Sequence, residues 1–488
     1  MTTSVRKIFR DFLLYGGGDF VSKLLGFVTL PIYTRIFSTA EYGILSYTFS
    51  FTLLLMSVVM VGGDQVYVRF YFEAPGDQER RTLTPTWLLF LALWGSLVAL
   101  ALLPWSGALA RWSFEAGGYA PLIVVAILGV PVGLVNRVCG HVLRARFQSR
   151  FGAALNLATA AMSVVFGLIG AVPLGMGLFG IFAGILVAEI VMLPLRLWSI
   201  RPLLGPRFSL SLLRRVLAFG IPLMPTVLAA WVFTMSDRLM LSKLASLEAV
   251  GHYSVAAALV SVISLANVAL AQAWGPHAVV AYERAPARAP AFYGRIMTYV
   301  LAGFGLLCVA VTTFGAEIVH LLTVPAFYPA VKVIGPLALG IVAYATSQLT
   351  GIGVILRKKT KRLAVLSVCA AALNIVLNLV LIPRFGMMGA AWATAFSYLA
   401  LTLGYLAASQ RLFATAYECR RGLTIIALLI AFTLGVAYLP SLPLASSLAL
   451  KAMYLAAFVA ALFMLRAFDR REIEALRMFW SRARKRGG

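Results

Sequence analysis

Ionisable side chains within the long apolar segments of this chain are few and well separated. Asp19 and Lys23 stand four residues apart in one such segment, a spacing that places both on one face of a helix. Glu189 lies in another, with no Lys or Arg within four positions. A charge surrounded by apolar groups is costly unless it faces a cavity or a partner, so each residue is a candidate for binding or ion chemistry.

Two interpretations stay open for each of these residues. Asp19 and Lys23 form either a self-neutralised structural pair or a cavity site, in which Lys23 binds an anionic ligand and Asp19 tunes it or carries a proton. Glu189 is either a neutral hydrogen-bonded acid, or one near the surface, or a group that takes up a proton or binds a cation.

Other charges stand at the ends of apolar segments. Arg35 ends the first segment, and Asp237 with Arg238 ends the seventh. From these positions the long arginine side chains could reach the polar interface of a membrane or bind an anionic ligand. Asp64 and Arg69 follow the second segment, where a solvated face is the simpler interpretation.

The composition indicates that the solvent of this chain is lipid. Of 488 residues, 61% are hydrophobic and only 12% are charged, which leaves too little polar surface for a water-soluble globule of this size. Stretches of about 20 apolar residues cross a bilayer as helices. We predict fourteen such spans, at roughly 11–35, 42–62, 83–104, 119–136, 151–172, 177–195, 216–236, 250–274, 296–315, 331–356, 363–382, 386–408, 422–439 and 446–465.

The net charge of +25 follows from basic connectors rather than from nucleic-acid binding. If the two ends and every second connector are cytoplasmic, most of the 42 Lys and Arg lie inside, as the positive-inside rule requires. The four cysteines stand apart, so neither a disulfide framework nor a metal site is predicted, and no connector has room for a catalytic domain. We therefore predict no enzyme, no catalytic residue, no metal and no cofactor beyond a coupling ion, Na⁺ or H⁺.

An internal repeat predicts two lobes. Arg150 is followed by Pro173 and Gly177-x-x-Gly180, and Arg362 by Pro383 and Gly386-x-x-Gly389, at the same place in each series of six spans. Six spans between equivalents give both lobes the same orientation, related by an axis along the membrane normal. The fold expected is an all-α membrane protein with two six-helix lobes and two extra C-terminal helices. Its parts are an N-terminal lobe (1–195), a basic cytoplasmic connector (196–215), a C-terminal lobe (216–408), helices 13 and 14 (409–467) and a basic cytoplasmic tail (468–488).

Glycine and proline interrupt the leading span of each predicted lobe. Corresponding interruptions in two halves point to a substrate site and to helices that bend during transport, although these residues are also common in membrane helices generally. The predicted hinge residues are Gly16, Gly17, Gly18 and Pro31 in the first span, and Gly220, Pro222 and Pro225 in the seventh.

Several short motifs, each weak alone, are informative through their order and placement. They are Ser22 to Phe27 with Pro31 and Arg35, Glu41-Tyr42-Gly43, Asp237-Arg238-Leu239 with Lys243, Gly251-His252-Tyr253, and Leu321 to Ala330. With these spans and motifs, the chain resembles the polysaccharide flippases of the multidrug, oligosaccharidyl-lipid and polysaccharide exporter superfamily over essentially its whole length.

The resemblance implies the function. Such flippases move an undecaprenyl-diphosphate-linked oligosaccharide from the cytoplasmic to the outer leaflet of the bacterial inner membrane, for O-antigen, capsule or exopolysaccharide assembly. The related lipid II flippases have a basic residue where Lys23 stands, implicated in binding the diphosphate. The predicted substrate cations are Lys23, Arg35 and Arg238, and the predicted ion-coupling carboxylates are Asp19 and Glu189.

The expected partners are the lipid-linked glycan, the bilayer and the polysaccharide polymerase machinery, with no nucleic acid and with the protein as a monomer. Two alternatives are kept. One is a multidrug or metabolite cation antiporter of the same superfamily, although its drug-exporting branch typically has twelve spans and acidic cation sites. The other is a membrane-embedded polysaccharide polymerase or ligase, which generally needs a large outer loop with paired Arg and His.

Overall fold

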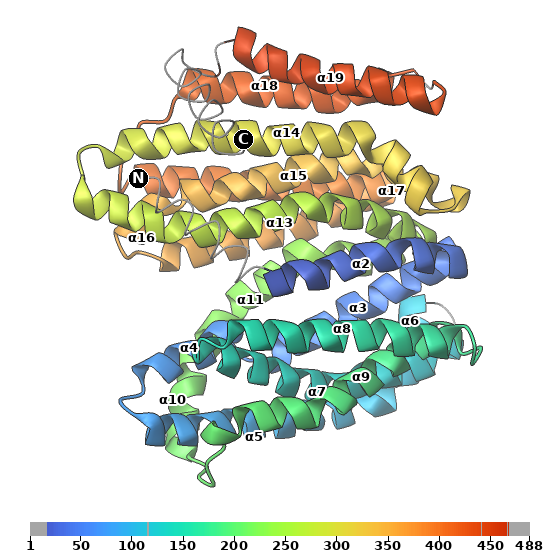
Figure 1. Ribbon diagram of the computed structural model, residues 1–488, viewed down its shortest axis with the longest axis vertical. Helices are drawn as coiled ribbons and strands as arrows, with labels where there is room; N and C mark the ends of the chain where they lie inside the picture. The colour runs from blue at the N-terminus through green and yellow to red at the C-terminus, as the bar shows by residue number, and fades with distance from the viewer. Residues whose placement is uncertain (1–16, 115–116, 441, 466, 468–488) are drawn as a thin grey trace, which may run out of the picture. The chain divides into compact units, whose positions relative to one another are not determined.

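The computed structural model describes residues 17–114, 117–440, 442–465 and 467, with their side chains except those of 17–26, 117 and 149. This part of the chain is helical, with no strand (Figure 1). The α-helices are α2 (Gly17–Ile36), α3 (Thr39–Val59), α4 (Asp64–Glu73), α5 (Asp77–Leu102), α6 (Ser106–Phe114), α7 (Ala120–Ala145), α8 (Ser149–Ala171), α9 (Gly177–Ile200), α10 (Leu210–Gly220), α11 (Met224–Trp231), α12 (Asp237–Leu244), α13 (Leu247–Arg284), α14 (Ala289–Leu322), α15 (Val331–Thr350), α16 (Ile352–Leu356), α17 (Lys361–Gln410), α18 (Cys419–Gly435) and α19 (Leu444–Met464).

Short 3₁₀ and π segments join or extend these helices. The 3₁₀ segments are η1 (Leu103–Trp105), η2 (Gly117–Tyr119), η3 (Arg201–Leu203), η4 (Ile221–Leu223), η6 (Pro325–Ala330) and η7 (Val436–Tyr438), and the π segment is η5 (Val232–Ser236).

Twelve segments of the described chain are long and apolar enough to cross a membrane. The prediction of an all-α, multi-pass membrane protein is therefore confirmed in this coarser form. The twelve do not include α2, and they count α17 as one segment. Two helices nevertheless meet inside α17 at Gly386, where φ is 54° and ψ is −132°.

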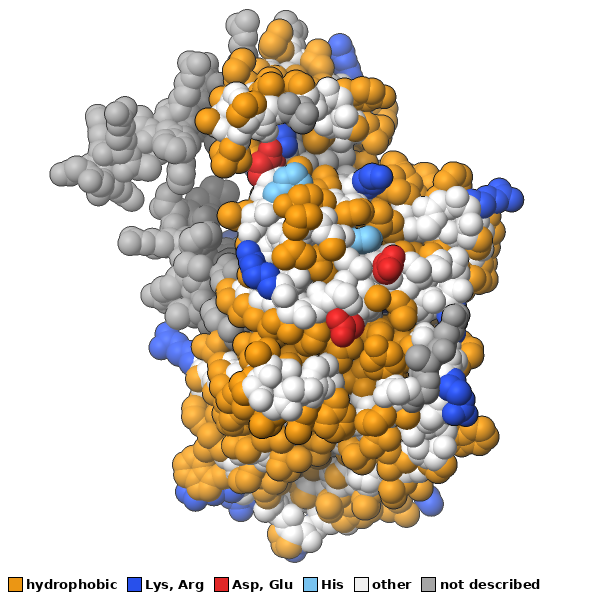
Figure 2. All heavy atoms as spheres, turned by 90° about the vertical axis from the view of Figure 1, so that its right-hand side faces the viewer, with side chains coloured by type: hydrophobic (Ala, Val, Ile, Leu, Met, Phe, Trp, Pro, Cys, Tyr) orange, Lys and Arg blue, Asp and Glu red, His pale blue; other side chains and the backbone are white. Residues whose placement is uncertain are grey.

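Large apolar side chains cover the outside of these helices. On α5, Leu89, Leu93, Leu97 and Leu100 follow helical spacing and are 48%, 69%, 58% and 64% exposed. Figure 2 shows hydrophobic side chains over much of the face that it presents, with charged side chains few. An apolar stripe of this extent is unfavourable in water and is typical of a surface that lipid tails cover.

The chain forms two compact units. Unit 1 comprises residues 1–258, 322–330 and 364–397, and unit 2 comprises residues 259–321, 331–363 and 398–488. In unit 1, α7 packs against both α5 and α9, and α8 lies along α9 (Figure 1).

Glycines set the spacing of α8 and α9. A Cβ on Gly184 would lie 2.2 Å from the backbone nitrogen of Gly167, and one on Gly180 would lie 2.3 Å from the carbonyl carbon of Gly170. Only residues without a side chain allow two membrane helices to approach this closely. The sequence motif around Gly177 and Gly180 is thus a packing motif.

The two copies of the sequence repeat share a local conformation. Gly177 and Gly386 both have φ of +54°, a left-handed value that favours glycine. A Cβ on the second glycine of each motif would meet the backbone of the preceding helix, at 2.3 Å from Gly170 for Gly180 and at 2.3 Å from Leu381 for Gly389. The same sequence pattern therefore makes the same tight helix connection twice.

The two leading spans differ. In its described part, α2 is one continuous helix that passes through Pro31. Two non-α segments interrupt the seventh predicted span. The first is η4, which contains Pro222 and follows the end of α10 at Gly220, and the second is the π segment η5, which lies between α11, with Pro225 in its first turn, and α12. The interruption predicted at Gly220 and Pro222 is present, and the π segment was not predicted.

In unit 2, α18 and α19 form a hairpin that an ion pair joins to α14. The Lys451 Nζ donates to both carboxylate oxygens of Glu317 at 2.6 and 2.7 Å, and the Ser447 Oγ donates to Oε1 at 2.8 Å. The side chains of Lys451 and Glu317 are only 10% and 17% exposed. Each charge is therefore largely removed from solvent and depends on the other.

Removing one partner of this pair is expected to destabilise unit 2. Lys451→Met leaves the Glu317 carboxylate without its cation, so the free energy of unfolding in detergent should fall by about 3 kcal/mol. The double variant Glu317→Leu/Lys451→Met removes both charges and should recover most of that loss. Thermal unfolding is the measurement, and Lys332→Met, at an exposed lysine, is the control. A double variant as unstable as the single one would contradict the ion-pair account.

Candidate functional site

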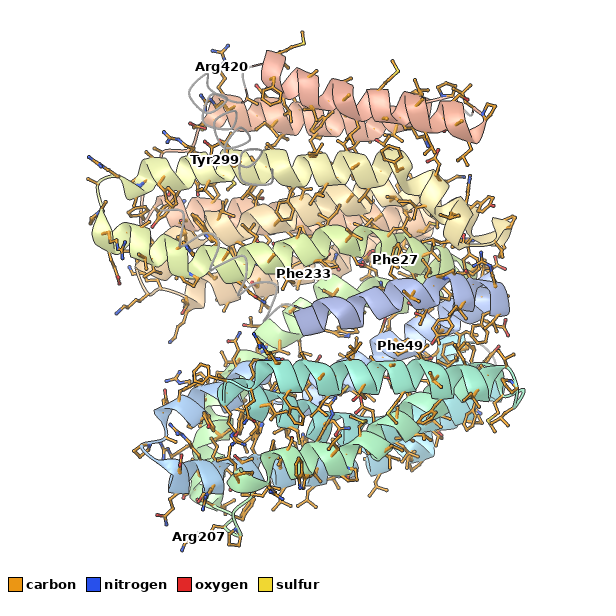
Figure 3. All side chains as sticks on the ribbon, viewed as in Figure 1. Phe27, Phe49, Arg207, Phe233, Tyr299 and Arg420 are labelled. Atoms are coloured by element: carbon orange, nitrogen blue, oxygen red, sulfur yellow. The ribbon has the colours of Figure 1, made fainter. Side chains whose placement is uncertain are left out.

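Asp237 is the most completely buried acid in the described part of unit 1. It begins α12 directly after the π segment η5, in which Figure 3 labels Phe233, and it is only 2% exposed. The sequence analysis placed Asp237 at the end of the seventh predicted span, and the structure shows that its side chain is enclosed within unit 1. A π turn shifts the residues that follow it to another face of the helix, and such turns are frequent at functional sites.

Three neutral side chains donate hydrogen bonds to this carboxylate. The Asn378 Nδ2 donates to Oδ1 at 2.9 Å, and the Thr394 Oγ1 donates to Oδ2 at 2.9 Å. The Tyr253 hydroxyl also donates to Oδ2. Helices α12, α13 and both halves of α17 thus meet at one carboxylate.

A second layer of polar groups surrounds the first. The Asn374 Oδ1 accepts hydrogen bonds from Asn378 Nδ2 at 3.1 Å and from Ser236 Oγ at 3.4 Å. Asn374 and Asn378 are fully buried, and the Asn378 Oδ1 has no hydrogen-bond partner within the described chain. Buried polar atoms are nearly always paired, and this oxygen is therefore available to accept a further donor or a cation.

The cluster of Asp237, Tyr253, Asn374, Asn378 and Thr394 carries one negative charge. Among the described residues, no Lys or Arg forms an ion pair with Asp237. A buried carboxylate without an ion-pair partner favours uptake of a proton or of a small cation. Carboxylate, amide and hydroxyl oxygens are ligands that hard cations prefer, and the described residues hold no group of three His, Cys, Asp or Glu for a transition metal.

Arg238 turns away from Asp237 toward α3. Its Nε donates to Ser46 Oγ at 3.1 Å, its Nη1 donates to the Thr234 carbonyl at 2.7 Å, and its guanidinium carbon lies 5.7 Å from the centre of the Tyr253 ring. The side chain is half-buried. Its Nη2 makes no hydrogen bond with the described residues and so remains available to an anion.

The other predicted cations are described less fully. Arg35 is exposed, and its Nη1 donates to the carbonyls of Pro31 at 2.7 Å and of Leu322 at 3.3 Å. Lys23 and Asp19 lie in α2, but their side chains are outside the described part of the structure, and Gly16 lies outside it altogether. Arg35 and Arg238 share no hydrogen-bond partner among the described residues.

Glu189 has neighbours from another helix and from further along its own. Its Oε2 accepts from the Asn136 amide of α7, whose backbone carbonyl accepts from Arg196 Nη1 at 3.3 Å. Arg196 was expected in the basic connector, but α9 continues to Ile200 and buries it at 4% exposure. Its guanidinium also donates to Asn156 Oδ1 at 3.0 Å and to Thr159 Oγ1 at 2.7 Å.

Arg196 is expected to stabilise unit 1 strongly. Arg196→Ala leaves the groups that it holds on α7 and α8 without donors, so the free energy of unfolding should fall by about 3 kcal/mol. Arg144→Ala, at an exposed arginine near the end of α7, should change it by no more than about 0.5 kcal/mol. Thermal unfolding of the purified variants tests this, and equal effects of both variants would contradict it.

Asp64 also has partners that the sequence did not predict. Its carboxylate accepts two hydrogen bonds from Arg137, at 3.0 and 3.2 Å, and lies 3.3 Å from Nε2 of the buried His141. The Asp64 side chain is 35% exposed, so it lies on a partly solvated face, but its charge is paired. Arg69, by contrast, pairs with Glu73 at 2.7 Å with both side chains half exposed.

A family model described as polysaccharide biosynthesis protein matches residues 8–279, which is more than half of the chain. The chain belongs to this family. A second model, described as MatE, matches residues 222–380, a range that contains Asp237, Asn374 and Asn378. No curated protein gives a significant match.

Solved structures show the fold of this family member. A lipid II flippase, MurJ, in an inward closed conformation gives a TM-score of 0.72 at 14% identity, covering 93% of this chain and 99% of that one. An inward-facing multidrug resistance MATE family transporter of the MOP superfamily gives 0.67 at 15% identity, covering 80% and 94%. A Vibrio cholerae MATE transporter gives 0.59 at 13% identity, covering 84% and 97%.

This member of the polysaccharide biosynthesis family thus has the fold of the MATE transporters and of the flippase MurJ, which are transporters rather than enzymes. The prediction that the chain is not an enzyme is confirmed. The alternative of a polymerase or ligase is set aside on the same finding.

Two features of the sequence could have indicated the Asp237 cluster. Asn374 and Asn378 lie one helical turn apart in an otherwise apolar stretch, where amides seldom occur without a partner. Asp237 directly follows the predicted seventh span, which contains two prolines. The sequence does not indicate that these residues meet, because their separation along the chain exceeds 130 positions.

Proposed function

We propose that this protein is a flippase that moves an undecaprenyl-diphosphate-linked oligosaccharide from the cytoplasmic to the outer leaflet of a bacterial inner membrane. Membership of the polysaccharide biosynthesis family and a fold shared with a lipid II flippase support this substrate class. The observation on which the transport mechanism rests is the buried carboxylate of Asp237, which has three hydrogen-bond donors but no ion-pair partner among the described residues. The protein acts as a monomer and hands its product to the polysaccharide polymerase machinery.

The proposed topology has fourteen spans, with both ends in the cytoplasm. The twelve candidate segments become fourteen when α2, a helix of 20 residues, is added and α17 is divided at Gly386. The shared conformation at Gly177 and Gly386 supports two lobes of six spans each, followed by α18 and α19.

The proposed substrate cations are Lys23, Arg35 and Arg238. A diphosphate needs charge-assisted donors in a partly dry cavity, and arginine and lysine supply them. Arg238 is the best supported of the three, because it is half-buried and its Nη2 has no partner within the described chain. The glycan would occupy the wet part of the cavity, while the lipid tail stays in the bilayer.

We assign the main coupling role to Asp237, with Asp19 and Glu189 as the further candidates. Na⁺ or H⁺ bound at Asp237 would neutralise its charge and draw together α12, α13 and α17, whose side chains already meet there. Arg238 is the next residue on α12. A shift of α12 on cation binding would therefore move a substrate cation directly, which couples the ion to the diphosphate.

A leaflet assay tests this function. In cells without the protein, lipid-linked oligosaccharide should accumulate on the cytoplasmic side. Cells that carry Lys23→Ala or Arg238→Ala should show the same accumulation, although the variant protein is inserted into the membrane at the normal level. Lys332→Ala, at an exposed lysine, is the control. If the oligosaccharide still reaches the outer leaflet in cells without the protein, the proposed function is wrong.

A cation-coupled exporter of drugs or metabolites is the second candidate. The MatE match and the MATE-like fold support it. Drug exporters of this kind typically have acidic cation sites, and the buried Asp237 is such an acid. Increased drug sensitivity on deletion, with normal surface polysaccharide, would favour this candidate over the flippase.

A further inference from the structure

A cavity of about 700 Å³ opens where the first turn of α5 meets η3 and the connector that leads to α10. Three arginines line it: Arg81 from α5, Arg201 from η3 and Arg207 from the connector, where Figure 3 labels it. All of these segments belong to unit 1. The positive-inside pattern predicts that all three lie on the cytoplasmic side.

The backbone holds the two sides of this cavity together. The Gly205 N–H donates to the Arg81 carbonyl at 3.2 Å, and a Cβ on Gly205 would lie 2.5 Å from that oxygen. Glycine therefore allows the connector to approach α5 closely. This contact fixes the backbone of the connector beside Arg81, and the arginines of both segments line the same cavity.

The charge of the cavity is positive and uncompensated. Asp77 is the one acid that lines it, and Asp77 already pairs with Arg80 at 3.2 Å. Among the described residues, none of Arg81, Arg201 and Arg207 takes part in an ion pair. Their guanidinium groups are free to bind an anion, and guanidinium matches the geometry of a phosphate.

Apolar side chains border the cationic cavity. Trp198 is 56% exposed, and the Arg201 guanidinium carbon lies 4.8 Å from the centre of its ring. Leu204, which lines the cavity, is 38% exposed, and Phe208, which follows Arg207 in the chain, is 50% exposed. Tryptophan beside arginine is typical of the membrane interface, where a headgroup and the start of an acyl chain lie side by side.

We propose that this cavity is a binding site for the phosphate headgroup of an anionic phospholipid of the cytoplasmic leaflet. The arginines contact the phosphate, and Trp198, Leu204 and Phe208 contact the upper part of the acyl chains. A soluble phosphate would gain nothing from these exposed apolar groups, so the lipid is the better match. The site is independent of the flippase proposal and of the Asp237 cluster.

The test uses the full-length protein in nanodiscs of phosphatidylcholine, with or without a minor fraction of phosphatidylglycerol. Phosphatidylglycerol should raise the unfolding temperature and be retained by the purified protein. Each arginine removed should weaken its binding about fivefold, so Arg207→Gln should show a partial loss and Arg81→Gln/Arg201→Gln/Arg207→Gln nearly a complete one. The single variant keeps the test valid if the triple variant does not fold.

The matched control removes the same charge elsewhere. Lys359→Gln/Lys361→Gln/Arg362→Gln alters three exposed residues of another cytoplasmic connector and should leave phosphatidylglycerol binding unchanged. Equal losses in both triple variants would mean that only general surface charge attracts the lipid, and the proposal would be wrong. Stabilisation by inorganic phosphate or pyrophosphate but not by phosphatidylglycerol would assign the cavity to a soluble anion and would also overturn it.

Discussion

Asp237→Asn is expected to lower flipping by about 100-fold while the protein remains inserted and folded. The change keeps the shape of the side chain but removes the only charge of the cluster, so neither a proton nor Na⁺ has a carboxylate to bind. The rate at which lipid-linked oligosaccharide appears in the outer leaflet is the measurement. Asp237→Glu, which keeps the charge at a shifted position, should retain part of the activity.

Glu248→Gln provides the control for this experiment. Glu248 is an exposed acid in the first turn of α13, so the same chemical change there should leave flipping unaltered. Full activity of Asp237→Asn would show that the buried carboxylate is structural. Loss of folded protein in Asp237→Asn would assign the cluster to stability rather than to coupling.

Gly43→Val and Gly251→Val are each expected to reduce flipping more than tenfold, because the first turns of α3 and α13 touch through these glycines. A Cβ on Gly43 would lie 1.9 Å from the Leu247 carbonyl oxygen, and one on Gly251 would lie 2.1 Å from that of Thr39. A side chain therefore cannot enter without separating the helices. Since both helix ends are predicted to face outward, the variants should fail to close the outer end.

A cysteine-accessibility experiment measures that opening. Ser254 lies one helical turn beyond Gly251, and its Oγ donates to Ser46 Oγ at 2.6 Å across the same contact. In a Ser254→Cys background with the exposed Cys369 and Cys419 replaced, an impermeant thiol reagent should react faster when Gly43 is valine. Gly303→Val, at a glycine with no atom within 4 Å of its added Cβ, should change neither flipping nor labelling. Unchanged labelling in Gly43→Val would contradict a gating role.

The sequence predicted the features that depend on local composition. The length of the apolar segments predicted the candidate spans. The charge pattern predicted that the connector containing Arg81 and the connector containing Gly205 lie on the same side of the membrane, and the hydrogen bond between these two residues agrees with it. The glycine motifs marked tight helix connections at Gly177 and Gly386, because a left-handed φ and a close backbone approach both demand glycine.

The sequence did not predict the features that depend on tertiary contacts. Glu189 was judged by charges within four positions, yet its neighbours come from α7 and from Arg196 two turns further along α9. Asp237 was judged by its place near a span end, yet the π turn before it directs it inward, where α13 and α17 supply donors. Neither the turn nor the meeting of these helices leaves a local signal in the sequence.

The most direct test of the account is flipping by the purified protein in liposomes loaded with a short undecaprenyl-diphosphate-linked oligosaccharide, with an imposed Na⁺ or H⁺ gradient. We predict gradient-dependent movement of the glycan between leaflets by the wild type, no gradient dependence in Asp237→Asn, and unchanged behaviour in Glu248→Gln. Coupling through the Asp237 cluster would be contradicted if movement of the glycan depended on neither gradient. It would also be contradicted if Asp237→Asn moved the glycan as well as the wild type does. No movement of the glycan under any gradient would contradict the flippase itself.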